Sequence, residues 1–207
     1  MDNNFITRVF IIALVLLSTA FHEMAHALVA TWLGDPTPGR HGRLTLNPIP
    51  HLQPVLTAVI LPVVMFLTTG GMMILATTPI NPSYFRHPLR DHALVAVAGP
   101  IMNVVCAAVM IGALWIPGLA QPYSISDGAL RGAVYINLIM AVFNMMPLPP
   151  LDGYWIVRAV LPLQVRRATD QWAANRFSFL LVILVGSNLM QFFYLPIRSV
   201  LSAVLPN

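Results

Sequence analysis

Long stretches without a single Asp, Glu, Lys or Arg limit what this chain of 207 residues can fold into. They are residues 9–22, 52–85, 93–126, 132–151 and 177–197. About 20 consecutive apolar residues are enough to cross the hydrocarbon core of a bilayer as a helix. Only 9% of the residues are charged, whereas soluble domains carry about 25%. The pattern therefore predicts an all-α polytopic membrane protein with about five to six transmembrane helices.

The boundaries of these helices follow from the apolar stretches and from the Pro and Gly residues between them. The predicted ranges are about 5–33, 54–76, 92–116, 130–147 and 177–195. The first run could also be the apolar core of a signal peptide. It continues to Leu33 without a small-residue cleavage site, so we interpret it as a retained span. No loop is long enough for an inserted soluble domain, which predicts a single domain over residues 1–207.

The sole glutamate of the chain, Glu23, lies in the first apolar run between His22 and His26. His22-Glu23-Met24-Ala25-His26 is an H-E-x-x-H motif. On a helix, positions i and i+4 share a face, so two neutral imidazoles can bind one Zn²⁺ while the glutamate acts on its water as a general base. Ionisable side chains in a transmembrane segment are costly and mark functional sites. The motif therefore predicts a metallohydrolase site inside the bilayer.

A catalytic zinc usually has three protein ligands and a water, so a third ligand is needed. There is no second glutamate, and Val29 and Trp32 occupy the positions where metzincins need Gly and His. Candidates are the other histidines and Asp2, Asp35, Asp91, Asp127, Asp152 and Asp170. Asp152 stands out because it follows a Pro-rich run at the end of an apolar span, where the helix must unwind. Unwound backbone in a membrane suits a polar cavity, although Asp152 could instead cap a helix that starts at Gly153.

The depth of these residues in the membrane predicts how the spans run. At a rise of about 1.5 Å per residue, the two histidines and Asp152 reach one depth only if the first span and the span over 130–147 run in the same direction. The helix at 92–116 supplies one reversal, so we expect residues 54–76 to form a re-entrant element rather than one complete crossing. Residues 43–46 alternate like a short strand, which we expect to be part of a re-entrant β element.

The arginines are divided unevenly between the two ends of the predicted spans. This topology places seven of them at one end: Arg40, Arg43, Arg86, Arg90, Arg158, Arg166 and Arg167. The other end receives Arg8, Arg131 and Arg198, and Arg176 lies at the border of the last span. By the positive-inside rule the first end is cytoplasmic, so the metal site is expected nearer the cytoplasmic face; a plain five-span alternation also gives an arginine bias. The arginines form no basic stripe, so no nucleic-acid partner is expected.

Two further motifs accompany H-E-x-x-H: Ala98-Gly99-Pro100-Ile101-Met102-Asn103, and Asn144-x-x-Pro-x-x-Pro-Leu-Asp152-Gly153. In this order they resemble the site-2 protease family of intramembrane zinc metalloproteases. The segment from Gly42 to His51, followed by Asn81-Pro82, is similar to the compact bacterial-type subgroup without a PDZ or CBS module. The likeness covers roughly residues 10–160 and carries more weight than H-E-x-x-H alone.

The resemblance implies that His22, His26 and Asp152 bind one Zn²⁺ per chain and that Glu23 activates a water molecule. It also implies that Asn144 holds the scissile peptide or stabilises its oxyanion. The expected function is hydrolysis of a peptide bond in or near a transmembrane segment of a membrane-anchored protein. The expected location is a lipid bilayer, the cytoplasmic membrane of a prokaryote.

The substrate is expected to bind in an extended form, because a helix hides its own carbonyls. We expect a strand over residues 42–48 to pair with the substrate at its edge. The residues expected to position the substrate are Thr45, His51 and Pro150. Asn103 is expected to form a structural hydrogen bond between helices. His41, His87 and His92 are expected to lie in interfacial loops.

The catalytic core is expected at about residues 5–160, with a C-terminal accessory helix at about 171–207. Two other functions could use the same His/Asp cluster: a non-proteolytic membrane scaffold or chaperone, and a metal-ion transporter. A structural zinc site needs no general base, which argues against the scaffold. Paired repeats with broken helices are not evident in the sequence, which argues against the transporter.

Overall fold

The computed structural model describes residues 3–51, 76–119, 121, 124–173, 192–193, 195–199 and 201–202. Its long helices are α1 (Asn3–Trp32), α5 (Pro88–Leu114) and α6 (Ile125–Asn144). Each contains a stretch long and apolar enough to cross a membrane, namely Ala13–Trp32, Pro88–Leu114 and Ile125–Asn144. The prediction of a helical, polytopic membrane protein is confirmed in this form. Nearly all of the re-entrant element predicted at 54–76 and of the helix predicted at 177–195 lies outside the described residues.

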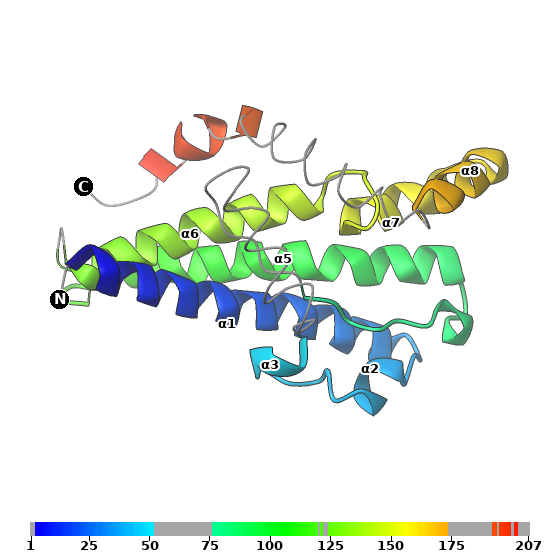
Figure 1. Cartoon of the computed structure of the whole chain (residues 1–207), viewed down its shortest axis with the longest axis horizontal. Coiled ribbons are helices and arrows are strands. Elements are labelled where there is room, and N and C mark those ends of the chain that lie inside the picture. Colours follow the sequence, from blue (N-terminus) through cyan, green and yellow to red (C-terminus); the bar gives the residue numbers. More distant parts are fainter. Residues whose placement is uncertain are drawn as a thin grey trace.

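Short helices flank this bundle (Figure 1). They are α2 (Thr37–Arg40), α3 (Pro48–His51), the 3₁₀ helix η2 (Pro82–Tyr84), α7 (Asp152–Val160) and α8 (Leu163–Ala173). No strand occurs in the described ranges. The predicted division into a catalytic core and a C-terminal accessory helix stays a prediction.

Helices α1, α5 and α6 pack pairwise, with α5 antiparallel to the other two (Figure 1). His22 of α1 contacts Asn103, whereas His26, one turn later, contacts Val95, earlier in α5. One turn before His22 in α1, Ser18 accepts a hydrogen bond from Asn137 of α6 at 2.9 Å. Helices α1 and α6 therefore run in the same direction, which is the arrangement that the depth argument predicts.

Both α5 and α6 begin about one turn before their predicted starts near residues 92 and 130. In α5 the carboxylate of Asp91 accepts the His87 backbone N–H at 2.9 Å, which caps the first turn. In α6 the Ser124 hydroxyl accepts the Asp127 N–H at 3.1 Å. Polar residues that resemble a loop in the sequence thus cap these helices, because side-chain oxygens satisfy the free N–H groups of a helix start.

The strand predicted over residues 42–48 is wrong, because residues 41–46 form turns and bends. Gly42 has φ +65°, a conformation that L side chains rarely adopt. The Arg43 N–H turns back to a carbonyl of α2 at 2.9 Å. The Asn47 side chain then accepts the N–H two residues ahead at 3.1 Å, which begins α3. These local bonds occupy backbone groups that an edge strand would leave free.

The Pro-rich segment between α6 and α7 is unwound over residues 145–151, as its prolines predict. Its end is packed closely against the start of α7. A Cβ on Gly153 would lie only 2.2 Å from the Met145 carbonyl oxygen, so only glycine fits there. This contact fixes the position of Asp152, the first residue of α7.

Helix α7 is joined to α8 by one carboxylate. The Arg158 guanidinium donates two hydrogen bonds to Asp170, each of 2.7 Å, and the Tyr154 hydroxyl donates a third at 2.5 Å. The hydrogen bonds from Arg158 lower the pKa of the Asp170 carboxyl to about 2. The ion pair therefore persists at neutral pH and connects the helix that carries Asp152 to its neighbour.

Candidate metal centre

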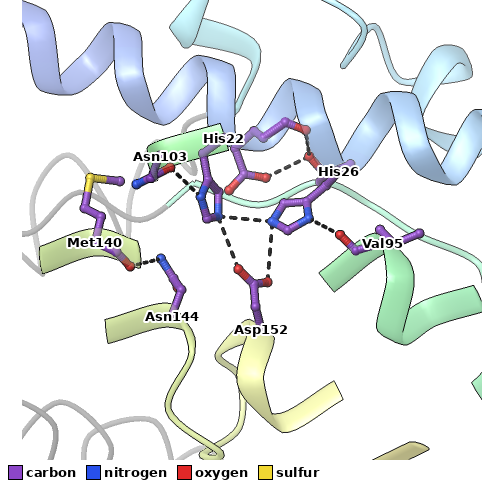
Figure 2. A network of polar contacts seen from close by, with 9 residues as sticks. His22, His26, Val95, Asn103, Met140, Asn144 and Asp152 are labelled. Carbon is purple, nitrogen blue, oxygen red and sulfur yellow. Dashed lines mark hydrogen bonds and ion pairs between the residues drawn. The ribbon is translucent and has the colours of Figure 1, made fainter. Parts of the chain in front are cut away.

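Helix α1 directs His22 and His26 toward Asp152 of α7 (Figure 2). The two Nε2 atoms lie 3.1 Å apart. His22 Nε2 lies 3.3 Å from Asp152 Oδ2, and His26 Nε2 lies 3.4 Å from Asp152 Oδ1. Both histidines are buried. The structure thus brings Asp152 next to His22, although the two residues are 130 positions apart in the sequence.

The hydrogen bonds behind the two rings determine which nitrogen faces the cluster. His22 Nδ1 lies 2.9 Å from Asn103 Oδ1, and His26 Nδ1 lies 2.7 Å from the Val95 carbonyl oxygen. Carbonyl oxygens only accept, so each Nδ1 carries a proton, and in the neutral imidazole each Nε2 then keeps a lone pair. Two ring nitrogens and a carboxylate, all of them acceptors, therefore converge on one point. Such a group is stable when a cation lies between its members.

The distances suit a tetrahedral zinc ion. Ligand atoms about 2.0–2.2 Å from such an ion lie roughly 3.3–3.6 Å from one another. The three observed separations run from 3.1 to 3.4 Å. Asp152 Oδ2 is buried and makes no hydrogen bond to the described residues. Within the described ranges, no other group of three His, Cys, Asp or Glu residues could hold a metal ion.

The alternative role for Asp152, capping a helix that starts at Gly153, does not match the geometry. Helix α7 begins at Asp152 itself, with Leu151 in the N-cap position and no side-chain cap hydrogen bond. The carboxylate faces the two histidines instead. Its function as a ligand stays a proposal, which the geometry supports.

Gly99 lets α5 approach the two imidazoles. A Cβ at this position would lie 2.3 Å from His26 Nε2 and 2.6 Å from His22 Nε2. One turn further along α5, Asn103 is fully buried and accepts the hydrogen bond from His22. The expected hydrogen bond between helices therefore exists, and it orients a candidate ligand. The Ala98–Asn103 motif thus supplies both the space for the rings and one of their partners.

Glu23 is buried, with 5% of its surface exposed, and lines a cavity of about 370 Å³ with the three candidate ligands. The Thr78 hydroxyl lies 2.7 Å from Glu23 Oε2 and 3.1 Å from the Glu23 carbonyl oxygen. The other walls come from residues 76–82, from the start of α5 and from residues 143–155. The glutamate and the candidate metal ligands therefore face the same cavity.

The remaining site predictions divide into two groups. Asn144 and Pro150 line the cavity, whereas Thr45 and His51 are not among the described residues that do so. Asn144 Nδ2 donates to the Met140 carbonyl at 3.0 Å (Figure 2), which leaves its second amide hydrogen for another acceptor. His51 is fully buried and donates from Nε2 to the Thr45 carbonyl at 2.9 Å. The functions of these four residues stay predictions.

His92 and Thr78 are among the cavity residues that were not expected from the sequence. The prediction that His92 lies in an interfacial loop is wrong, since it lies in α5, lines the cavity and stacks on Trp155 with 4.1 Å between ring centroids. His92 precedes Gly99 by 7 residues and Asn103 by 11. On a continuous helix this spacing places all three residues on one face, so the sequence contained a signal for the position of His92. Thr78 gives no such signal, because it lies in a non-helical segment far from Glu23 in the sequence.

Comparisons with known proteins agree on one family. The family model Peptidase family M50 matches residues 123–185, which include Asn144 and Asp152. The "Putative zinc metalloprotease YwhC" of Bacillus subtilis is 35% identical over 182 residues, which cover 85% of this chain and 80% of that protein.

Two further relatives carry names of the same kind. The "Putative zinc metalloprotease Rip2" of Mycolicibacterium smegmatis is 29% identical, covering 90% of this chain and 70% of the relative. The "Putative zinc metalloprotease MJ0611" of Methanocaldococcus jannaschii is 28% identical, covering 75% and 73%. No solved structure matches the chain significantly. From the family model and the identity and coverage of these relatives, the chain belongs to peptidase family M50, the site-2 protease family.

Proposed function

We propose that this chain is a zinc-dependent endopeptidase that cuts a membrane-anchored protein in or near a transmembrane segment. The observation that carries the proposal is the convergence of His22, His26 and Asp152 beside Glu23 in one cavity. The names of the relatives, which describe zinc metalloproteases, support it. Both histidines lie in the membrane-length part of α1, Ala13–Trp32, which supports cleavage at membrane depth.

The mechanism follows from the atoms that face the cavity. The two Nε2 atoms and the Asp152 carboxylate would hold the metal. When bound, zinc supplies Lewis acidity that lowers the pKa of a water molecule and polarises the peptide carbonyl. Glu23 takes the proton from the attacking water and passes it to the leaving amine nitrogen. The free amide hydrogen of Asn144 donates to the oxyanion.

The substrate segment must be unwound before it can react. In a helix each peptide carbonyl accepts an internal hydrogen bond, so the group that must be attacked is occupied. The cavity walls include non-helical backbone within residues 76–81 and at Pro150. Non-helical backbone at membrane depth is tolerated where it lines a wet cavity. We expect the unwound substrate segment to lie along these walls.

We assign the end of the bundle where α1 terminates to the cytoplasmic side of a prokaryotic membrane. Helices α2, α7 and α8 lie at this end (Figure 1). They carry Arg40, Arg158, Arg166 and Arg167. The positive-inside rule favours the cytoplasm for such an end, and the relatives are bacterial and archaeal. The metal centre would then open toward the cytoplasmic half of the membrane.

Profiling of new protein N-termini in the membranes of an expression host tests the proposal. Wild type and Glu23→Gln are compared, and the zinc content of each purified protein is measured. We expect new N-termini inside transmembrane segments with the wild type alone, while both proteins carry one zinc per chain. Identical profiles from two zinc-loaded proteins would refute the proteolytic function and favour a scaffold.

A further inference from the structure

We infer that Thr78 is a positioning residue for Glu23, holding one carboxylate oxygen so that the other can receive the proton of the attacking water. This inference rests on the proposed function, because it concerns the same general base. Thr78 is not part of H-E-x-x-H, and it lies 55 positions from Glu23 in the sequence.

The hydroxyl of Thr78 is placed to bind the carboxylate. It has a single hydrogen, which it can donate to Glu23 Oε2 at 2.7 Å or to the Glu23 carbonyl at 3.1 Å. The carboxylate oxygen is the nearer acceptor and carries charge, so it forms the stronger hydrogen bond. In the described part of the chain, no other hydrogen bond reaches the Glu23 carboxylate. The second oxygen, Oε1, is therefore available for the water.

The segment that carries Thr78 (residues 76–81) is itself held in place on both sides. The Thr77 N–H donates to the carbonyl of α3 residue His51 at 3.2 Å. The Asn81 N–H donates to Asp35 Oδ2 at 2.7 Å, and Asp35, just beyond the end of α1, is fully buried. Thr78 is thus fixed relative to α1 without depending on the substrate. A fixed donor can orient a catalytic side chain before the reaction begins.

This arrangement predicts an effect on the reaction rather than on substrate binding. A glutamate side chain has several rotamers, and burial alone does not select the one that faces the water. Misplacing a reacting group by about 1 Å can cost roughly 100-fold in rate. Removal of the Thr78 hydroxyl should therefore lower kcat and leave KM nearly unchanged.

The test compares Thr78→Val, which has the same shape without the hydroxyl, with Thr78→Ser, which keeps it. The kinetic substrate is a synthetic peptide that spans the strongest Glu23-dependent cleavage site. We expect kcat to fall about 10- to 100-fold in Thr78→Val and to stay within about threefold of wild type in Thr78→Ser, with one zinc per chain in both. Thr78→Ala, which adds no bulk, replaces the valine variant if that variant does not fold.

Thr31→Val is the matched control. The Thr31 hydroxyl donates to the Ala27 carbonyl of its own helix at 2.7 Å, and Thr31 is exposed. It is not among the described residues that line the cavity. This variant should keep the wild-type kcat, which separates the loss of a threonine hydroxyl in general from the loss of this one.

Binding of acetohydroxamate, measured by calorimetry on the zinc-loaded proteins, gives a readout that needs no peptide substrate. A hydroxamate donates its hydroxyl proton to the general base, so its affinity depends on where Glu23 points. We expect about tenfold weaker binding in Thr78→Val and wild-type binding in Thr78→Ser. Unchanged kcat and unchanged hydroxamate affinity in Thr78→Val would overturn the inference about Thr78 and leave the proposed function intact. A wild type that cleaves nothing would overturn the proposed function, and the hydroxamate comparison would still decide the question about Thr78.

Discussion

Replacement of Gly99 by alanine should destroy the metal centre through a single methyl group. The added Cβ would lie 2.3 Å from His26 Nε2 and 2.5 Å from His22 Cε1, whereas ordinary contacts begin at 3.4 Å. The rings would have to move by about 1 Å, while metal–ligand distances tolerate about 0.2 Å. They cannot rotate away freely, because Asn103 and Val95 hold both Nδ1 atoms. Mutation of a residue that only hydrogen-bonds to a metal ligand lowers metal affinity by about 10- to 100-fold. Because Gly99→Ala would displace the ligands themselves, we expect zinc affinity to fall by at least about 100-fold.

Competition with a zinc chelator measures this affinity in detergent. Gly112→Ala is the matched control, because it lies in the same helix and a Cβ there would meet nothing within 4 Å. It should bind zinc like the wild type. A folded Gly99→Ala protein with zinc affinity within about threefold of wild type would refute the packing argument.

Three further predictions concern the supports of the site. Asn103→Leu removes the acceptor of the His22 Nδ1 proton, so zinc affinity should fall about 10- to 100-fold; an unchanged chelator titration would contradict this. Gly153→Ala would place a Cβ 2.2 Å from a backbone oxygen, so calorimetry should show a destabilisation of about 1–3 kcal/mol, and an unchanged Tm would count against it. The pKa of Asp170 is lowered to about 2, so its ionised form stabilises the α7–α8 contact above about pH 4 and loses this effect as the pH falls toward 2. Asp170→Asn should remove this acid-dependent loss of Tm, and an identical pH profile would exclude the ion pair as its cause.

The sequence is sufficient to locate the parts of the site that have a periodic or exclusive signal. His22 and His26 lie four residues apart on a helix, and Glu23 is the sole glutamate. Asp152 could be selected because the prolines before it force the backbone to unwind in an apolar region. The same constraint on depth predicts that α1 and α6 run in one direction, as the structure shows.

Other features depend on contacts that no local pattern encodes. The alternation at residues 43–46 resembles a strand, but Gly42 and Asn47 bend the chain into turns through local hydrogen bonds. The neighbouring charges suggest a loop at His92, although Asp91 caps α5 and brings His92 into the helix. Contacts between distant, non-periodic segments, such as that of Thr78 with Glu23, become visible only in the folded chain.

The most direct test of the account is the zinc content of the detergent-purified wild type beside Asp152→Ala and His22→Ala. We predict one zinc per chain in the wild type and weakened or lost zinc in both variants, because the proposed site joins the two motifs. Zinc retained at full affinity in a folded Asp152→Ala protein would contradict it, since Asp152 would then not be a ligand.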